Sequence, residues 1–167
     1  MSRSLFDDLD ASPAGVMEAA DSRTLRLSAH PLTQAELEGL LRYQEAFLAH
    51  REQSPAGHEA LVRAHELGLE ASGLDMKVVE LGTALLRAYS GQRWTGRKLR
   101  ARLAELEKQT DAASVEKAAR VGDELRRIED LEPLARRYGQ QAIELLDQHE
   151  ERLVDLHTRM QKALTQA

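Results

Sequence analysis

Apolar residues recur at helical spacing through most of the sequence, from about residue 33 to residue 164. Intervals of three and four residues, as in Leu37, Leu40, Leu41 and Leu48, place apolar side chains on one side of a helix. Each such stripe must be buried against another, and a chain of 167 residues is long enough to form one core. The sequence therefore predicts an all-α fold, a helical bundle of five to six amphipathic helices formed by residues 31–167 as a single domain.

Capping and helix-breaking residues divide this pattern into separate helices. Thr33 and Glu36 form a capping box, which predicts a first helix that runs to about Glu52. Later helix starts are expected where an N-cap residue or a first-turn proline precedes an apolar stripe, at Ser54-Pro55, Asp75, Thr95, Asp111 and Asp130-Pro133. Two glycines are expected to end the second and third helices, Gly73 and Gly91.

A seam with heptad spacing marks the last part of the chain, residues 142–163, and consists of Ala142, Leu146, His149, Leu153, Leu156, Met160 and Ala163. A straight helix over residues 111–164 would be roughly 80 Å long, whereas the radius of gyration of a compact domain of this size is about 15 Å. We therefore expect the chain to fold back near Asp130–Pro133 or near Gly139. The alternative is one long helix that forms a homodimer through the seam. His149 is expected to be a half-buried seam residue in either case.

Residues 1–30 lack sustained helical periodicity and are rich in Asp and Ser, which predicts a flexible or loosely docked N-terminal arm with little regular structure. This segment contains a short motif of apolar and acidic residues, Leu5, Phe6, Asp7, Asp8 and Leu9. Such a motif is typical of a segment that docks into a partner. The alternative is that its apolar side chains cover the protein's own core.

The residue patterns that catalysis and metal binding require are missing from the sequence. It contains no cysteine, which excludes thiolate nucleophiles and cysteine metal sites. No histidine has a histidine or carboxylate three or four residues away, and phosphate-binding glycine loops and nucleophile elbows are absent. His58 and His65, two helical turns apart, could each contribute one ligand to a site between helices. The sequence predicts a protein that is not an enzyme and that has no metal site and no cofactor.

Basic residues are concentrated in one segment, residues 92–109, together with the single tryptophan. The candidate partner-binding residues there are Arg93, Trp94, Arg97, Lys98 and Arg100. They could offset the acidic residues of the following helix, bind an acidic protein, or bind nucleic acid or anionic lipid. Trp94 itself is expected to anchor a helix junction in the core.

The net charge of −5 argues against nonspecific nucleic-acid binding by the whole chain. The sequence shows neither a signal peptide nor an apolar run long enough to span a membrane, so a cytoplasmic location is expected. These features favour a non-enzymatic protein–protein interaction module: an adaptor, a regulatory subunit, or a small chaperone for assembly or secretion. The alternative is a nucleic-acid-binding regulator, in which a turn at Gly91 precedes a recognition helix formed by residues 93–102.

Overall fold

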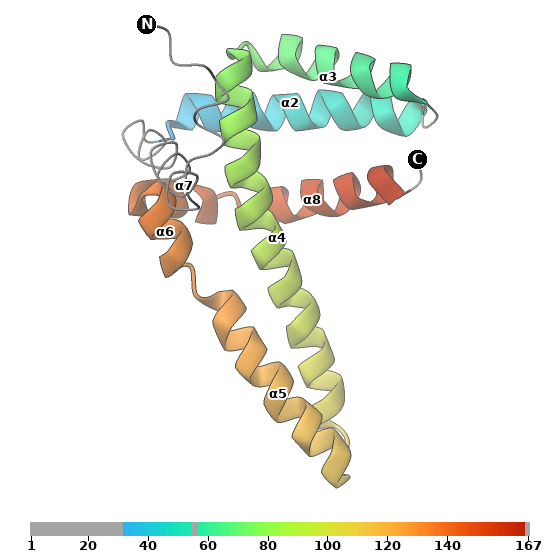
Figure 1. Ribbon diagram of the computed structural model, residues 1–167, viewed down its shortest axis with the longest axis vertical. Coiled ribbons are helices and arrows are strands. Elements are labelled where there is room, and N and C mark those ends of the chain that lie inside the picture. The colour runs from blue at the N-terminus through green and yellow to red at the C-terminus, as the bar shows by residue number, and fades with distance from the viewer. Residues whose placement is uncertain (1–31, 55–56, 166–167) are drawn as a thin grey trace, which may run out of the picture.

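The computed structural model describes residues 32–54 and 57–165, and these residues form helices without any strand. The predicted all-α fold is therefore confirmed. The helices are α2 (Gln34–Gln53), α3 (His58–Ser72), α4 (Met76–Glu107), α5 (Ala112–Glu129), α6 (Glu132–Tyr138), α7 (Gln140–Asp147) and α8 (Glu150–Thr165) (Figure 1).

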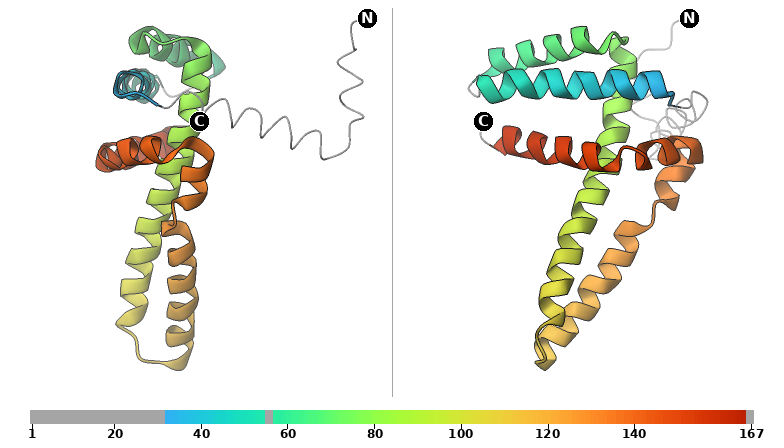
Figure 2. Two further views of the ribbon diagram at one scale, coloured as in Figure 1. Left: turned by 90° about the vertical axis from the view of Figure 1, so that its left-hand side faces the viewer. Right: turned by 180° about the vertical axis from the view of Figure 1, so that it is seen from behind.

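The described helices form a head from which a two-helix arm projects (Figures 1 and 2). Helices α2 and α3 form an antiparallel pair beside the first part of α4. Helix α8 runs alongside α2 and crosses α4 transversely near its middle. Beyond this crossing α4 continues out of the head and pairs with α5, so residues 97–129 form the arm.

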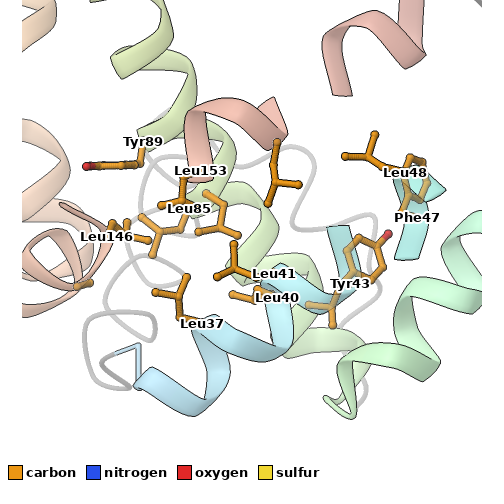
Figure 3. Close-up of a cluster of buried hydrophobic side chains, with 14 of the residues drawn as sticks. Leu37, Leu40, Leu41, Tyr43, Phe47, Leu48, Leu85, Tyr89, Leu146 and Leu153 are labelled. Carbon is orange, nitrogen blue, oxygen red and sulfur yellow. The ribbon is translucent and has the colours of Figure 1, made fainter. Parts of the chain in front are cut away.

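The core lies in the head, where α2, α4, α7 and α8 meet (Figure 3). Apolar side chains from all four helices are almost completely buried there, including Leu40, Leu86, Leu146 and Leu153. Tyr89 is also fully buried, at the edge of the core that faces the arm. Residues far apart in the sequence thus share one interior, which fixes where α8 crosses α4.

Two ion pairs link α2 to α8 at the surface of the head. Arg152 Nη2 lies 2.5 Å from Glu45 Oε1, and Arg159 Nε lies 3.0 Å from Glu52 Oε1. Both pairs join residues 107 positions apart, so the two helices run parallel. Partly exposed pairs of this kind contribute little to stability, and their main effect is to fix the register of the two helices.

Several predicted helix ends are confirmed. The side chains of Thr33, Asp75 and Asp111 accept hydrogen bonds from backbone amides at the starts of α2, α4 and α5. Gly73 ends α3 with a φ of +66°, a conformation that favours glycine. Helix α5 ends near Asp130–Pro133, as expected, but α6 continues in roughly the same direction, and the chain turns at Gly139, the other expected position, where φ is +94° between α6 and α7 (Figures 1 and 2).

The predicted break at Gly91 and the predicted cap at Thr95 are wrong, because α4 is one helix of 32 residues. Packing explains its continuity: Tyr89, Ser90 and Gly96 are all buried against other helices, so tertiary contacts outweigh the low helix propensity of the glycines.

The predicted start of the second helix at Ser54 is also wrong. The Ser54 amide instead donates to the His50 carbonyl and ends α2, and Gly57 precedes α3. Pro55 lies outside the described residues.

The heptad seam is divided between α7 and α8 by a short break at residues 148–149. Four of its residues, Ala142, Leu146, Leu153 and Leu156, are buried in the chain's own core, and Met160 and Ala163 pack against that core. His149 is half-buried, as expected, and its Nε2 lies 3.5 Å from the Gln34 side-chain nitrogen. The seam therefore holds α7 and α8 onto the head.

The arm has a thin interior. In α4 no residue beyond Gly96 is buried, and α5 buries Ser114, Val121 and Leu125. Val115, near the tip, is 58% exposed. No helix in the described ranges has the length and apolar character required to cross a membrane.

Candidate functional site

The predicted basic segment lies where the arm leaves the head, and α4 divides its side chains between two faces. Arg93, Arg97 and Arg100 lie on one face, seven residues or two helical turns from first to last. Trp94 and Lys98 lie on another, one turn apart. The structure thus separates the five candidate residues of this segment into two groups with different surroundings.

The first group, which we call the junction cluster, is paired with acidic residues. Arg93 lies 3.1 Å from Asp147 and 3.2 Å from Glu150. Arg97 approaches Glu151 at 3.6 Å, and Arg100 Nε donates to Glu129 Oε1 at 2.6 Å. A polar recess of about 250 Å³ lies among these side chains. Since the arginines are matched by carboxylates, the junction cluster is suited to holding the arm against α8.

The base of the junction cluster is a buried tyrosine. The Tyr89 hydroxyl donates to Asp147 Oδ1 at 2.5 Å, and the Arg93 guanidinium lies 5.6 Å from the centre of the Tyr89 ring. Burial, followed by the bond to Asp147, raises the pKa of Tyr89 above its ordinary value, so the hydroxyl stays protonated and remains a donor. Tyr89 therefore links the core to the ion pairs of the junction.

The prediction that the basic segment offsets the acidic residues of the following helix holds for Arg100 and Glu129. The remaining junction pairs use acidic residues at the end of α7 and the start of α8, which the sequence pattern did not indicate.

The second group forms what we call the Trp94 face: Arg87, Trp94 and Lys98 of α4 with His157 of α8. Lys98 Nζ lies 3.6 Å from the centre of the Trp94 ring, a cation–π contact. The His157 ring meets the Trp94 ring edge-on, at 5.6 Å between centres. Trp94 remains partly exposed and lies within a continuous helix, so the expectation that it anchors a helix junction in the core is wrong.

The basic side chains of the Trp94 face differ in their surroundings from the arginines of the junction cluster. In the described ranges, neither Arg87 nor Lys98 forms an ion pair, in contrast to the arginines of the junction cluster. A small groove of about 40 Å³ between α4 and α8 adjoins this face, and its lining includes Arg87, His157, Met160 and Leu164. Among the described residues, the Trp94 face therefore combines partly exposed aromatic and aliphatic surface with positive charge that no carboxylate compensates.

Sequence reasoning missed Arg87 and His157. Arg87 could have been found, because it lies seven residues before Trp94 in residues 81–104, a stretch without an acidic residue. His157 could not, because only the crossing of α8 over α4 brings it to Trp94.

The pKa of His157 is lowered, first because the ring is partly buried and then because Arg87 is near. In the unfolded chain His157 binds a proton at the ordinary pKa of about 6.5, whereas in the folded chain it binds the proton only at a lower pH. We therefore expect stability to fall as the pH drops below about 6.5, and this loss should be smaller in His157→Gln.

Trp94 provides the measurement, since it is the chain's single tryptophan and a protonated imidazole quenches tryptophan fluorescence. Native-state fluorescence should titrate with a midpoint below 6.5, and the titration should disappear in His157→Gln. A midpoint at or above the ordinary value, or a titration that survives the substitution, would contradict this assignment.

The other histidines considered as ligands do not converge. His65 Nδ1 lies 2.6 Å from the Tyr43 hydroxyl, and His58 is exposed at the start of α3. Within the part of the chain that the structure describes, no three His, Asp or Glu side chains gather in a way that could hold a metal ion. The N-terminal motif of Leu5, Phe6, Asp7, Asp8 and Leu9 lies outside the described residues.

Comparisons with protein-family models, with curated proteins and with solved structures found no match to this chain.

Proposed function

We propose that this protein is a protein–protein interaction module that binds its partner through the Trp94 face. The observation that supports this proposal is a partly exposed tryptophan flanked by cations that have no ion-pair partner in the described part of the chain. Tryptophan and arginine are over-represented among the residues that dominate binding energy at protein interfaces. Both occur on this face, and Arg93, Arg97 and Arg100 of α4 are occupied in the junction cluster.

Two observations favour this proposal over a nucleic-acid-binding regulator. A helix-turn-helix requires a turn before its recognition helix, and α4 continues through Gly91. Arg93, Arg97 and Arg100, which would contact DNA in that arrangement, are paired with carboxylates. Phosphate contacts by those arginines would have to break existing ion pairs.

Affinity capture with the full-length protein and two variants tests the proposal. Trp94→Ala removes the aromatic surface, and Arg127→Glu reverses an exposed charge on α5 as the control. Proteins enriched by the wild type should be lost with Trp94→Ala and retained with Arg127→Glu, while circular dichroism shows the same helix content in all three. Equal recovery by the wild type and Trp94→Ala would refute the proposal.

A further inference from the structure

We propose that the Trp94 face binds an acidic, leucine-bearing segment of a partner protein. This inference rests on the proposed function and specifies the chemistry of the partner. Three features of the face support it: positive charge that is unpaired within the described residues, an aromatic and aliphatic surface, and a small number of cations.

The charge of the face selects an acidic partner. Residues 81–104 contain basic residues but no Asp or Glu, although the chain as a whole has a net charge of −5. Along this stretch the junction-cluster arginines are compensated by carboxylates from α5, α7 and α8. Arg87 and Lys98, like Arg102 one turn beyond Lys98, have no such compensation in the described residues. An incoming carboxylate can therefore pair with either of them without displacing an existing ion pair.

The uncharged part of the face selects an aliphatic side chain. The Trp94 ring is partly exposed, with Lys98 over its face and His157 at its edge. The adjoining groove is lined by Met160 and by Leu164, which is 46% exposed. Methionine adapts to aliphatic partners of different shape, and a leucine side chain could cover this surface together with the exposed part of the ring.

The number of cations favours a protein segment over nucleic acid. Affinity for DNA depends on neutralising several phosphates, and this face, with Arg102 one turn beyond Lys98, offers three cations on a chain that is acidic overall. One or two carboxylates beside a leucine match these cations, whereas a continuous phosphate backbone does not.

The test measures the binding of three probes to the full-length protein. None of the probes contains tryptophan, so binding is detected by the change in Trp94 fluorescence at low ionic strength. The first probe is a synthetic amphipathic peptide of leucine and glutamate. The second is the same peptide with lysine in place of glutamate, and the third is a mixed-sequence DNA duplex. We expect a saturable change with the glutamate peptide alone, and we expect added salt to weaken the binding.

Charge-reversal variants identify the surface that binds the glutamate peptide. Lys98→Glu should weaken binding at least tenfold, whereas the matched control Arg127→Glu should bind as the wild type does. No saturable change, equal binding of both peptides, binding of the DNA duplex instead, or an unaffected Lys98→Glu variant would each overturn the inference.

The chain's own acidic motif is the remaining possible occupant, and a variant of the full chain distinguishes it. Asp7, Asp8 and Asp10 are replaced together by asparagine. Under the inference this variant binds the glutamate peptide as the wild type does. Peptide binding that appears only in the variant would assign the face to the chain's own motif and overturn the proposed partner.

The capture experiment separates the two proposals. Should the peptide fail to bind while Trp94→Ala still abolishes partner capture, the interaction function would stand and the acidic chemistry would be wrong. Should capture also survive Trp94→Ala, both proposals would fall.

Discussion

Replacing Leu146 with alanine should lower the free energy of unfolding by about 2–5 kcal/mol, the usual cost of a cavity left by a buried leucine. Leu146 is fully buried, and it lies in α7, a helix of eight residues. Apart from Leu146, only Ala142 and Ile143 of this helix are buried. The substitution therefore removes one of the three buried side chains through which this short helix packs into the core.

Urea denaturation followed by circular dichroism measures this effect, and Leu81→Ala is the matched control. Leu81 also lies in a helix but is 41% exposed, so the same change should cost less than about 1 kcal/mol. Similar losses for the two variants would show that α7 is not packed into the core as described.

Replacing Gly68 with alanine should destabilise the protein by about 1–3 kcal/mol through overpacking, even though alanine has the higher helix propensity. A Cβ atom at Gly68 would lie 2.6 Å from Tyr43 Cδ2 and 3.0 Å from the Tyr43 carbonyl oxygen. The tyrosine cannot move aside easily, since it is buried and its hydroxyl is bonded to His65. Helices α2 and α3 would have to separate.

The same substitution at Gly122 should have the opposite sign. Gly122 lies within α5, and a Cβ atom there would meet nothing within 4 Å. Alanine should therefore stabilise the protein by up to about 1 kcal/mol through helix propensity alone. Chemical denaturation of both variants checks the pair of predictions, and destabilisation by Gly122→Ala would contradict the open surroundings of that residue.

Local signals in the sequence were sufficient where side chain and backbone interact over a few residues. Thr33, Asp75 and Asp111 cap helices as predicted, because an N-cap contact involves residues two or three positions apart. The boundary between α5 and α6 near Asp130 also followed from local chemistry, since the Asp130 side chain accepts the Glu132 amide and Pro133 lies in the first turn of α6.

Predictions of helix ends were wrong where tertiary packing, and not the local sequence, determines whether a helix continues. Gly91 on its own resembles a helix end, but α4 continues through it. A Cβ atom at Gly91 would lie 3.6 Å from the His157 ring of α8. The break at residues 148–149 carries neither proline nor glycine. It separates two parts of a regular heptad pattern, so periodicity predicted one helix there.

The candidate site shows the same division. The composition of the basic segment identified Trp94 and Lys98, but it could not separate them from Arg93, Arg97 and Arg100. That separation depends on where α8 crosses α4, and hence on the core formed by helices distant in sequence.

Because α4 is one continuous helix, a tilt near its middle moves its far end. Its 32 residues span about 48 Å at 1.5 Å per residue, and the head holds only the first two thirds of that length. Trp94 lies close to the pivot, whereas residues 97–107 extend about 16 Å beyond it. A tilt of about 10° at the pivot would displace the far end of the helix by about 3 Å, so a small adjustment beside Trp94 becomes a larger movement at the tip of the arm.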